Sequence, residues 1–264
     1  MQSKQLGDTT TEVSEIGLGT AGYTVGPEAL RRGMALGATL IDTAESYRTE
    51  ARVGEAIAGI RDQVFIATKV SKSHFRSDDV IAAADGSLRL LDTDRIDLYQ
   101  LHQPSNEIPI EETMAAMDRL VDDGKVKFIG VSNFSVEQLK EAQAASEHKI
   151  VANQVQYSLF ARSIEEELLP YCQENDVTII AYSPLAARGA LDYITGRKPH
   201  EALEAVSKAT GKTPAQVALN WCTSKDGVMA IPKSNSVQRT EENCAASGWR
   251  LSEEHIALLE GAFK

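Results

Sequence analysis

Short apolar, β-rich runs alternate with helix-like segments along the whole chain of 264 residues. The pattern predicts eight strands, at 15–19, 39–43, 64–69, 96–102, 127–132, 151–157, 177–183 and 228–232. Helices are expected between and after them, at 28–37, 50–60, 78–91, 110–123, 136–147, 164–175, 200–224, 236–246 and 253–263. Eight strand–helix units in about 250 residues are typical of a (β/α)₈ barrel. The nearly continuous apolar runs suit strands that are covered on both faces.

The chain contains no Pro-, Gly- or Ser-rich linker that would separate two domains. We therefore interpret residues 1–264 as one α/β domain, a single TIM barrel. Two short segments, Lys4–Leu6 and Glu12–Val13, flank Gly7-Asp8 and predict a small N-terminal β-hairpin at the bottom of the barrel.

The charge and the composition argue against several classes of protein. A net charge of −11 and a pI near 5.0 disfavour a nucleic-acid surface and an anionic membrane. The N-terminus has no apolar signal-peptide core, and no apolar run approaches the length of a membrane span. Cys172, Cys222 and Cys244 lie far apart and outside any CxxC pattern. We expect a cytoplasmic protein that binds neither nucleic acid nor membrane, and a monomer, although an oligomer is not excluded.

Polar groups end nearly every predicted strand, which is where barrels of this type carry their chemistry. These groups are Gly19-Thr20, Asp42, Lys69, His102, Ser132-Asn133, Gln154, Tyr182-Ser183 and Lys233-Ser234. A buried Lys69 and a buried Asp42 would be costly unless they satisfied one another. Tyr47 closely follows Asp42, so we expect a phenol whose acidity is tuned by an ammonium and a carboxylate.

A competing motif lies at residues 17–22, which fit the dinucleotide fingerprint GxGxxG, with Asp42 twenty residues beyond Gly22. The preceding strand contains Ser14 and Glu15, and the next helix begins near Pro27 rather than on the glycines. Because the remaining chain supplies barrel-like units, we favour the barrel over a Rossmann fold. Gly19 would then allow a substrate or cofactor to approach the backbone closely.

The motifs, taken in order, resemble the aldo-keto reductase family over nearly the whole chain. The matching segments are LIDTAESY, FIATKV, DLYQLHQP, GKVKFIGVSNF, NQVQYS, IIAYSPL and AIPKSNSVQRTEEN. The resemblance implies reduction of aldehydes or ketones to alcohols, with a small carbonyl compound as substrate. It also implies NADPH as cofactor, with NADH possible, and a catalytic set of Asp42, Tyr47, Lys69 and His102.

The resemblance assigns a role to each residue. Tyr47 would protonate the carbonyl oxygen, Lys69 would lower the pKa of Tyr47, and Asp42 would hold Lys69. His102 would donate to the same oxygen and orient it. Ser132, Asn133 and Gln154 would bind the nicotinamide amide, and Tyr182 would stack on its ring. Lys233, Ser234 and Arg239 would bind the 2′-phosphate. Glu242 and Asn243 would contact adenine, and Gly19, Thr20, Ser183 and Leu185 complete the predicted cofactor-binding set.

Two departures from the family pattern bear on the substrate. Ala21 and Gln103 stand where many members carry tryptophan, and the chain ends at Lys264 directly after a helix, without a long C-terminal loop. We therefore predict an open pocket that favours small or polar carbonyls.

Other functions stay open at this point. A cofactor-binding sensor or regulatory subunit is one alternative, and a Schiff-base aldolase that uses Lys69 is another. Singly, Lys69 with Asp42 could be a structural ion pair, and His102 could be a core histidine. We expect no metal, because the other histidines show no ligand spacing.

Overall fold

The computed structural model describes residues 1–185 and 191–263. Eight parallel strands lie side by side in chain order. They are β3 (Leu18–Gly19), β4 (Leu40–Asp42), β5 (Phe65–Val70), β6 (Ile96–Leu101), β7 (Val126–Ser132), β8 (Ile150–Gln156), β9 (Thr178–Tyr182) and β10 (Val228–Ala230). Parallel bridges from Ile16 to Ala230 and from Gly19 to Lys233 join the last strand to the first. The sheet therefore closes on itself, which confirms the predicted barrel and rules out the doubly wound alternative.

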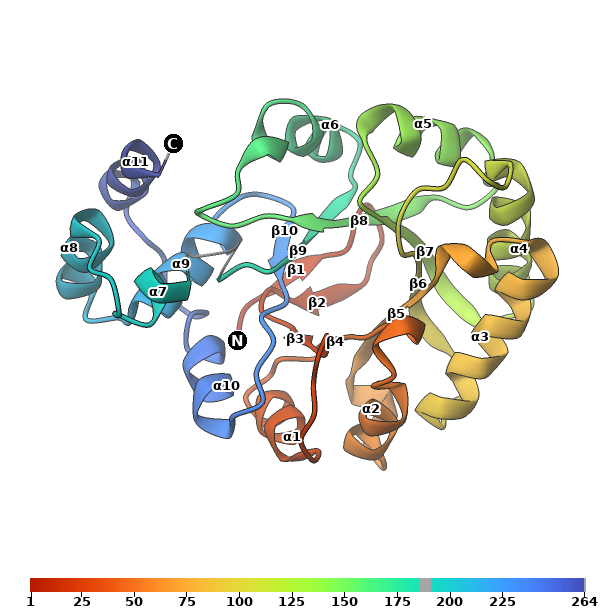
Figure 1. The fold of residues 1–264 in the computed structure, drawn as a ribbon, viewed down its shortest axis with the longest axis horizontal. Coiled ribbons are helices and arrows are strands. Elements are labelled where there is room, and N and C mark those ends of the chain that lie inside the picture. Colours follow the sequence, from red (N-terminus) through yellow and green to blue (C-terminus); the bar gives the residue numbers. More distant parts are fainter. Residues whose placement is uncertain (186–190, 264) are drawn as a thin grey trace.

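Helices surround the barrel on its outer face (Figure 1). They are α1 (Glu28–Ala35), α2 (Glu50–Ile57), α3 (Ser77–Leu91), α4 (Ile110–Asp122), α5 (Val136–Ala144), α6 (Leu168–Glu174), α7 (Leu191–Ile194), α8 (Glu201–Thr210), α9 (Pro214–Thr223), α10 (Val237–Cys244) and α11 (Glu253–Ala262). Short 3₁₀ turns are η1 (Glu45–Tyr47), η2 (Arg61–Gln63), η3 (Lys72–His74) and η4 (Ser163–Glu165). None of the helices in the described ranges is long and apolar enough to cross a bilayer.

The segment expected as one helix at 200–224 is divided into α8 and α9. Gly211 adopts a left-handed conformation with φ 66° and ends α8. Thr213 then caps α9, because its side chain accepts from Gln216 N while Gln216 returns a bond, and Pro214 occupies the first turn.

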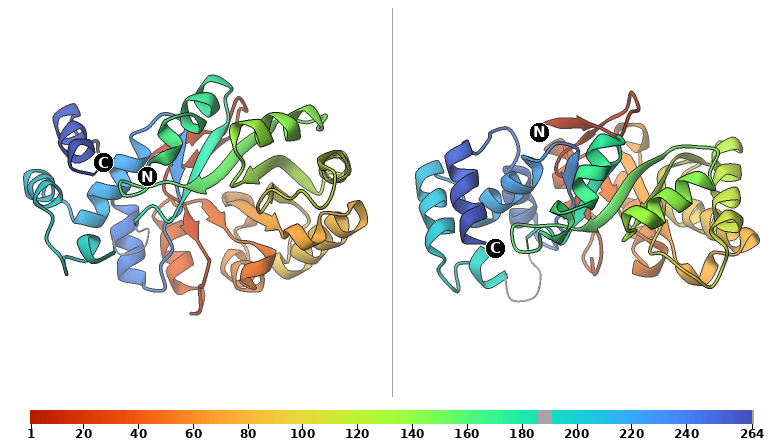
Figure 2. Two further views of the ribbon diagram at one scale, coloured as in Figure 1. Left: turned by 45° about the horizontal axis from the view of Figure 1, so that its top comes forward. Right: turned by 90° about the horizontal axis from the view of Figure 1, so that it is seen from above.

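The N-terminal hairpin is present, and it lies across one end of the barrel (Figure 2). Strand β1 (Ser3–Gln5) pairs antiparallel with β2 (Glu12–Ser14). Leu6 and Val13 pack into the inner core of the barrel, and the Lys4 ammonium donates to three backbone carbonyls near the end of α9 and the start of β10. The hairpin therefore seals the bottom end with both apolar and polar contacts.

The two-residue alternation of the strands decides where the polar side chains lie. Inside the barrel, Leu40, Ala67 and Ala152 belong to the inner apolar core. Two residues beyond each of them come Asp42, Lys69 and Gln154, which must face the same interior. The polar site is therefore one layer above the apolar core, at the C-terminal ends of the strands.

Candidate active site

A buried ion pair forms the floor of the site. Lys69 Nζ donates to Asp42 Oδ2 at 2.6 Å and to the backbone oxygen of Thr43 at 2.8 Å. Gln154 Nε2 donates to the same Asp42 Oδ2 at 2.7 Å. Lys69 is 0% exposed and Asp42 2% exposed, so water contributes little to their solvation. The two buried charges therefore neutralise each other, as the sequence predicted. Gln154 links this pair across the barrel to β8.

Tyr47 reaches this floor from η1, the turn that follows β4. The turn ends at Arg48, whose left-handed φ of 57° reverses the chain directly after the tyrosine. Tyr47 Oη lies 3.5 Å from His102 Nε2, and the two rings meet edge to face with centroids 5.4 Å apart. Lys69 Nζ lies 4.9 Å from the centroid of the Tyr47 ring. The structure therefore brings all four predicted catalytic residues together.

The acidity of Tyr47 differs from the expectation that Lys69 lowers it. Burial raises the pKa of Tyr47 above its usual range, and the nearby Asp42 carboxylate raises it further. The physical reason is that Asp42 pairs so closely with Lys69 that the phenol faces a dipole rather than an isolated positive charge. Burial also lowers the pKa of Lys69, and Asp42 opposes that fall.

Burial lowers the pKa of His102 as well, and the positive charge of Lys69 lowers it further, although Asp42 and Glu45 act in the opposite direction. His102 is therefore neutral at pH 7, and only one of its ring nitrogens carries a hydrogen. The His102 backbone is fixed from the neighbouring strand end, because Asn133 Nδ2 donates to its carbonyl oxygen at 3.2 Å.

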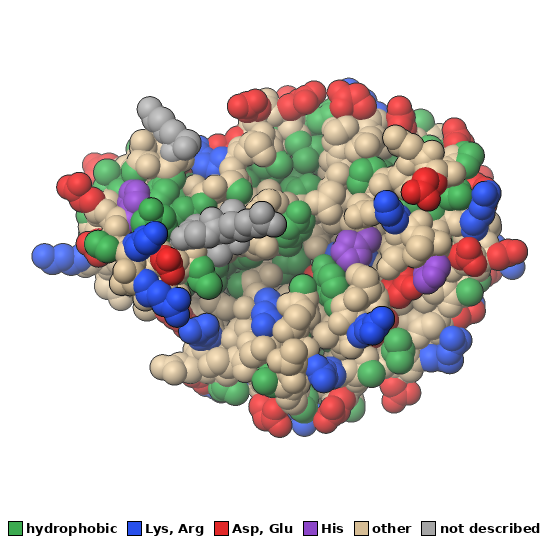
Figure 3. Space-filling model, in the orientation of Figure 1, with side chains coloured by type: hydrophobic (Ala, Val, Ile, Leu, Met, Phe, Trp, Pro, Cys, Tyr) green, Lys and Arg blue, Asp and Glu red, His purple; other side chains and the backbone are tan. Residues whose placement is uncertain are grey.

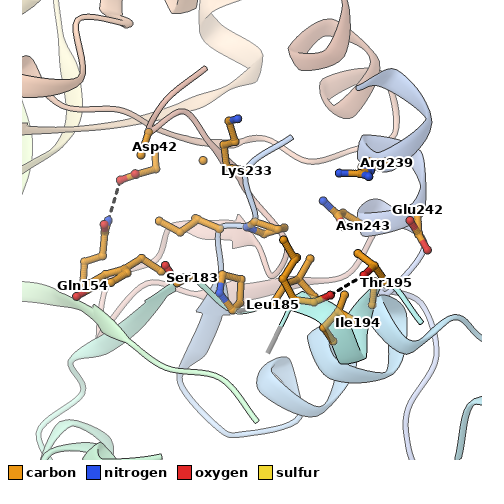
Figure 4. A pocket seen from close by; sticks show the side chains of 18 of the residues that line it. Asp42, Gln154, Ser183, Leu185, Ile194, Thr195, Lys233, Arg239, Glu242 and Asn243 are labelled. Atoms are coloured by element: carbon orange, nitrogen blue, oxygen red, sulfur yellow. Dashed lines mark hydrogen bonds between the residues drawn. The ribbon is translucent and has the colours of Figure 1, made fainter. Parts of the chain in front are cut away.

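A pocket of about 950 Å³ opens above these residues. Figure 3 shows that this face of the molecule is hollowed near its middle, with apolar, basic and histidine side chains at the edges. In Figure 4 the Asp42–Gln154 bond lies at one end of the pocket, and Arg239, Glu242 and Asn243 of α10 lie at the other. Most predicted site residues line it: Gly19, Asp42, Tyr47, His102, Ser132, Asn133, Gln154, Tyr182, Ser183, Leu185, Lys233, Arg239, Glu242 and Asn243.

Three predicted residues lie behind the pocket wall. Lys69 is beneath the floor, as described above. The Thr20 hydroxyl donates to the backbone oxygen of Asp42 at 2.9 Å and is fully buried. The Ser234 hydroxyl donates to the backbone oxygen of Ser236 at 2.9 Å. Thr20 and Ser234 therefore shape the ends of β4 and of the loop after β10 through these bonds.

Gly19 lines the pocket, but the barrel seam also requires a glycine there. A Cβ at this position would lie 2.7 Å from the backbone oxygen of Ile231, which belongs to the segment that closes the barrel. The lack of a side chain at Gly19 is thus needed for packing as well as for access to the backbone.

Sequence reasoning missed one wall of the pocket. The additional lining residues are Pro184, Leu191, Ile194, Thr195, Gly196, Thr213, Pro214, Ala215, Ile231 and Pro232. Helix α7 spans only Leu191–Ile194, too short for a periodic signal. The Thr213-Pro214 cap begins α9, and its position beside the pocket depends on the turn that precedes this helix. Ala21 and Gln103 also line the pocket, where the family resemblance placed them.

The donor set fits a long ligand with an amide at one end and a phosphate at the other. Near the floor, Tyr182 Oη donates to Asn133 Oδ1 at 3.0 Å, and Asn133 is held in a left-handed conformation with φ 64°. Lys233 and, at the far end, Arg239 supply positive charge in a strongly acidic protein (Figure 4). Within 1–185 and 191–263, no group of three His, Cys, Asp or Glu is placed to hold a metal ion. A barrel that carries this polar cluster beside a long pocket fits an enzyme that binds a nucleotide cofactor at the C-terminal ends of its strands.

Comparisons with known proteins agree with this class. The model of the aldo/keto reductase family matches residues 15–264. The chain is 41% identical to methylglyoxal reductase YeaE of Escherichia coli over 239 residues, covering 89% of this chain and 83% of that protein. The crystal structure of an aldo-keto reductase from Klebsiella pneumoniae in complex with NADPH is 37% identical and superposes with a TM-score of 0.90, covering 100% of this chain and 96% of that one. The thermostable aldo-keto reductase Tm1743 is 39% identical, with a TM-score of 0.90 and coverage of 99% and 100%.

The chain therefore belongs to the aldo/keto reductase family, and it is an oxidoreductase that reduces carbonyl groups. The combination of family, fold and intact site favours an enzyme over the sensor and aldolase alternatives.

Proposed function

We propose that this protein reduces small aldehydes and ketones, 2-oxoaldehydes such as methylglyoxal among them, with NADPH as its cofactor and Tyr47 as its proton donor. The observation that carries the proposal is the convergence of Tyr47 Oη and His102 Nε2, 3.5 Å apart, above the buried Lys69–Asp42 pair. NADPH, when bound, supplies the hydride that reaches the carbonyl carbon.

The carbonyl oxygen of the substrate would sit between Tyr47 and His102 and accept a hydrogen bond from each. Such donors stabilise the negative charge that develops on the oxygen during reduction. The raised pKa of Tyr47 keeps its phenol protonated at neutral pH. An alkoxide is nevertheless the stronger base, since the conjugate acid of the comparable hydroxide has a pKa of ~15.7. The proton therefore passes from Tyr47 to the reduced oxygen.

The Lys69–Asp42 pair would act as a positioning device for Tyr47. It joins the ends of β4 and β5, and Gln154 connects it to β8. Lys69 Nζ faces the ring of Tyr47 at 4.9 Å, which places the positive end of the pair toward the phenol. This contact would hold the Tyr47 ring in place above the pair.

The cofactor contacts follow from the same geometry. Gln154 Nε2 is occupied by Asp42, so its Oε1 would accept from the nicotinamide amide, which Ser132 and Asn133 also contact. The half-buried ring of Tyr182 would stack on the nicotinamide.

Lys233, together with Arg239 at the other end of the pocket, would bind the 2′-phosphate, and Glu242 and Asn243 would contact adenine. Thr20 and Ser234 would contribute through their backbone, and Ser183 and Leu185 through the pocket wall. The crystal structure of the Klebsiella pneumoniae relative in complex with NADPH supports NADPH as the cofactor.

The substrate class rests on the pocket and on the relatives. Ala21 and Gln103 leave the substrate end without the indoles that many family members place there. An E. coli relative that is 41% identical is named a methylglyoxal reductase. We also propose that residues 1–264 form one domain and that the enzyme is a monomer, which light scattering after size exclusion checks.

The function is tested by following NADPH oxidation with a carbonyl panel that includes methylglyoxal and a nitrobenzaldehyde. Turnover with NADPH supports the proposal, and a lower KM for NADPH than for NADH supports the cofactor assignment. NADPH binding without turnover of any carbonyl would favour a sensor. A borohydride-trapped adduct on Lys69 would favour an aldolase instead.

A further inference from the structure

Three buried threonine hydroxyls lie in a row beside the turn that carries Tyr47. The Thr20 hydroxyl donates to the backbone oxygen of Asp42 at 2.9 Å, and Thr20 Oγ1 and Thr49 Oγ1 lie 2.9 Å apart. Thr49 Oγ1 lies a further 2.9 Å from Thr43 Oγ1. The three threonines are 2% exposed or less, and none of them is among the described residues that line the pocket. Their hydroxyls therefore act on the protein itself rather than on a bound ligand.

Hydrogen counting fixes the direction of the row, because each threonine hydroxyl carries a single hydrogen. The carbonyl oxygen of Asp42 can only accept, so the hydrogen of Thr20 is used there and Thr20 accepts from Thr49. The hydrogen of Thr49 is then used as well, so Thr43 donates to Thr49. In this arrangement each of the three short contacts has its hydrogen. Removing the Thr49 hydroxyl would therefore leave the buried Thr43 donor without its acceptor.

Thr43 and Thr49 stand at the two ends of the Tyr47 turn, which we define as residues 44–48. Their hydroxyl contact closes the base of this turn. The turn ends in Arg48, a non-glycine residue with a left-handed φ of 57°. A non-glycine residue keeps such a conformation only when the surrounding structure holds it there. The bond between Thr43 and Thr49 supplies this hold, directly beside Arg48.

Both ends of the Tyr47 turn are also attached to β5. The backbone oxygen of Thr43 accepts from Lys69 Nζ at 2.8 Å. Beyond the other end, the buried Glu50 carboxylate accepts from Thr68 Oγ1 at 2.6 Å. Neighbouring residues of a strand point to opposite faces, so Lys69 holds the first end from inside the barrel and Thr68 holds the second from outside. The hydroxyl bond at the base of the turn joins these two attachments into a closed frame.

We propose that Thr49 is a positioning residue for carbonyl reduction, whose buried hydroxyl holds the Tyr47 turn in the conformation that places the phenol beside His102. This role rests on the proposed function of the site, because it matters to turnover only if Tyr47 is the proton donor. Loss of the hydroxyl displaces or loosens the phenol and leaves the cofactor contacts in place. We therefore expect kcat to fall while NADPH affinity stays nearly unchanged.

The test compares Thr49→Val, which has the shape of threonine without its hydroxyl, with Thr49→Ser, which keeps the hydroxyl. We expect Thr49→Val to lower kcat about tenfold, the effect of one hydrogen bond on the alignment of the transition state. Thr49→Ser should recover most of the activity. Thr178→Val is the matched control: Thr178 is equally buried at the start of β9, and its hydroxyl accepts from Gly7 N at 2.8 Å, at the opposite end of the barrel. This control should keep the wild-type kcat.

A second readout needs no turnover. In protein labelled with 3-fluorotyrosine, ¹⁹F NMR reports on the tyrosine rings, and Tyr47→Phe identifies the signal of Tyr47. Thr49→Val should shift or broaden this signal, whereas Thr49→Ser and Thr178→Val should leave it as in the wild type. Because the spectrum is recorded without substrate, it separates failure of this proposal from failure of the proposed function, which would appear as inactivity of the wild type.

Two results would overturn the proposal. One is a Thr49→Val enzyme whose kcat lies within twofold of the Thr49→Ser enzyme. The other is a Tyr47 signal that Thr49→Val leaves unchanged, whatever its activity. If Thr49→Val folds poorly, Thr43→Val removes the same bond from the other end of the turn, and both readouts then apply to that variant.

Discussion

Lys69 Nζ and Asp42 Oδ2 are joined at 2.6 Å inside the barrel, and both side chains are almost completely shielded from water. The same carboxylate oxygen accepts from Gln154, so three strands meet at one atom. The bonds at the floor of the site therefore hold three strands together, in addition to any part they take in the chemistry.

Replacing Lys69 by Met should therefore reduce both stability and activity. It leaves the Asp42 carboxylate buried without its counter-charge, a change that typically costs about 3–5 kcal/mol of unfolding free energy. Adding Asp42→Asn in the same chain removes the stranded charge and should recover much of the stability but little of the turnover. Urea unfolding and steady-state rates measure the two effects. A single variant that loses less than about 1 kcal/mol would show that the pair is not shielded as described.

The pH dependence of reduction should follow the raised pKa of Tyr47. Tyr47 is active in its protonated form, and its ionisation is shifted above the ordinary phenol value of ~10. We expect kcat/KM for carbonyl reduction to stay flat through neutral pH and to fall only above about pH 10. Rates measured in buffers of constant ionic strength test this. An alkaline limb centred near pH 8 would mean that Lys69 outweighs burial and Asp42 at the phenol.

The cofactor preference should depend on Arg239. Arg239→Ala removes a guanidinium from the far end of the pocket, where the 2′-phosphate would bind. NADPH affinity should fall by about 2 kcal/mol, the order of a charge-assisted hydrogen bond, while NADH affinity changes little. Fluorescence titration measures both dissociation constants. Arg89→Ala, an exposed arginine on α3, is the matched control. Equal losses for both cofactors would assign Arg239 to a shared part of the ligand.

Much of this architecture could be predicted from the sequence because strand alternation is a local property. Asp42, Lys69 and Gln154 each lie two residues beyond an apolar core residue, and the structure places all three in one layer. The family resemblance implies Arg239 and Asn243 as cofactor-binding residues, and both line the end of the pocket opposite Asp42 and Gln154.

Other features could not be predicted because they depend on the three-dimensional environment. The direction of the Tyr47 pKa shift is set by burial and by the nearby Asp42 carboxylate, and a sequence does not show how deeply the phenol is buried. Leu191 and Ile194 line the pocket from a four-residue helix that has no periodicity. The prediction of an open pocket rests partly on Lys264, which lies outside the described residues.

Substrate size should respond to the wall beside His102. Small or polar carbonyls should be preferred in the wild type, and steroid-sized ketones should be poor substrates. Gln103→Trp restores an indole to the pocket lining and should raise kcat/KM for a bulky aromatic aldehyde, since each ~40 Å² of apolar contact contributes about 1 kcal/mol. Gln103→Leu, which introduces an apolar side chain smaller than an indole, is the control for the loss of the glutamine. A wild-type enzyme that prefers a large apolar ketone more than tenfold would show that another segment already closes over the site.

The assignment of Tyr47 as the proton donor is tested most directly by Tyr47→Phe, which removes the phenolic hydroxyl and keeps the ring. The measurement is the rate of NADPH oxidation with methylglyoxal, together with NADPH affinity, in wild type, Tyr47→Phe and the remote control Tyr171→Phe on α6. We predict that Tyr47→Phe lowers kcat by at least ~10², the effect of losing a general acid, while NADPH affinity stays nearly unchanged and the control retains wild-type rates. A Tyr47→Phe enzyme that turns over at the wild-type rate would contradict the account and move the proton donor to His102.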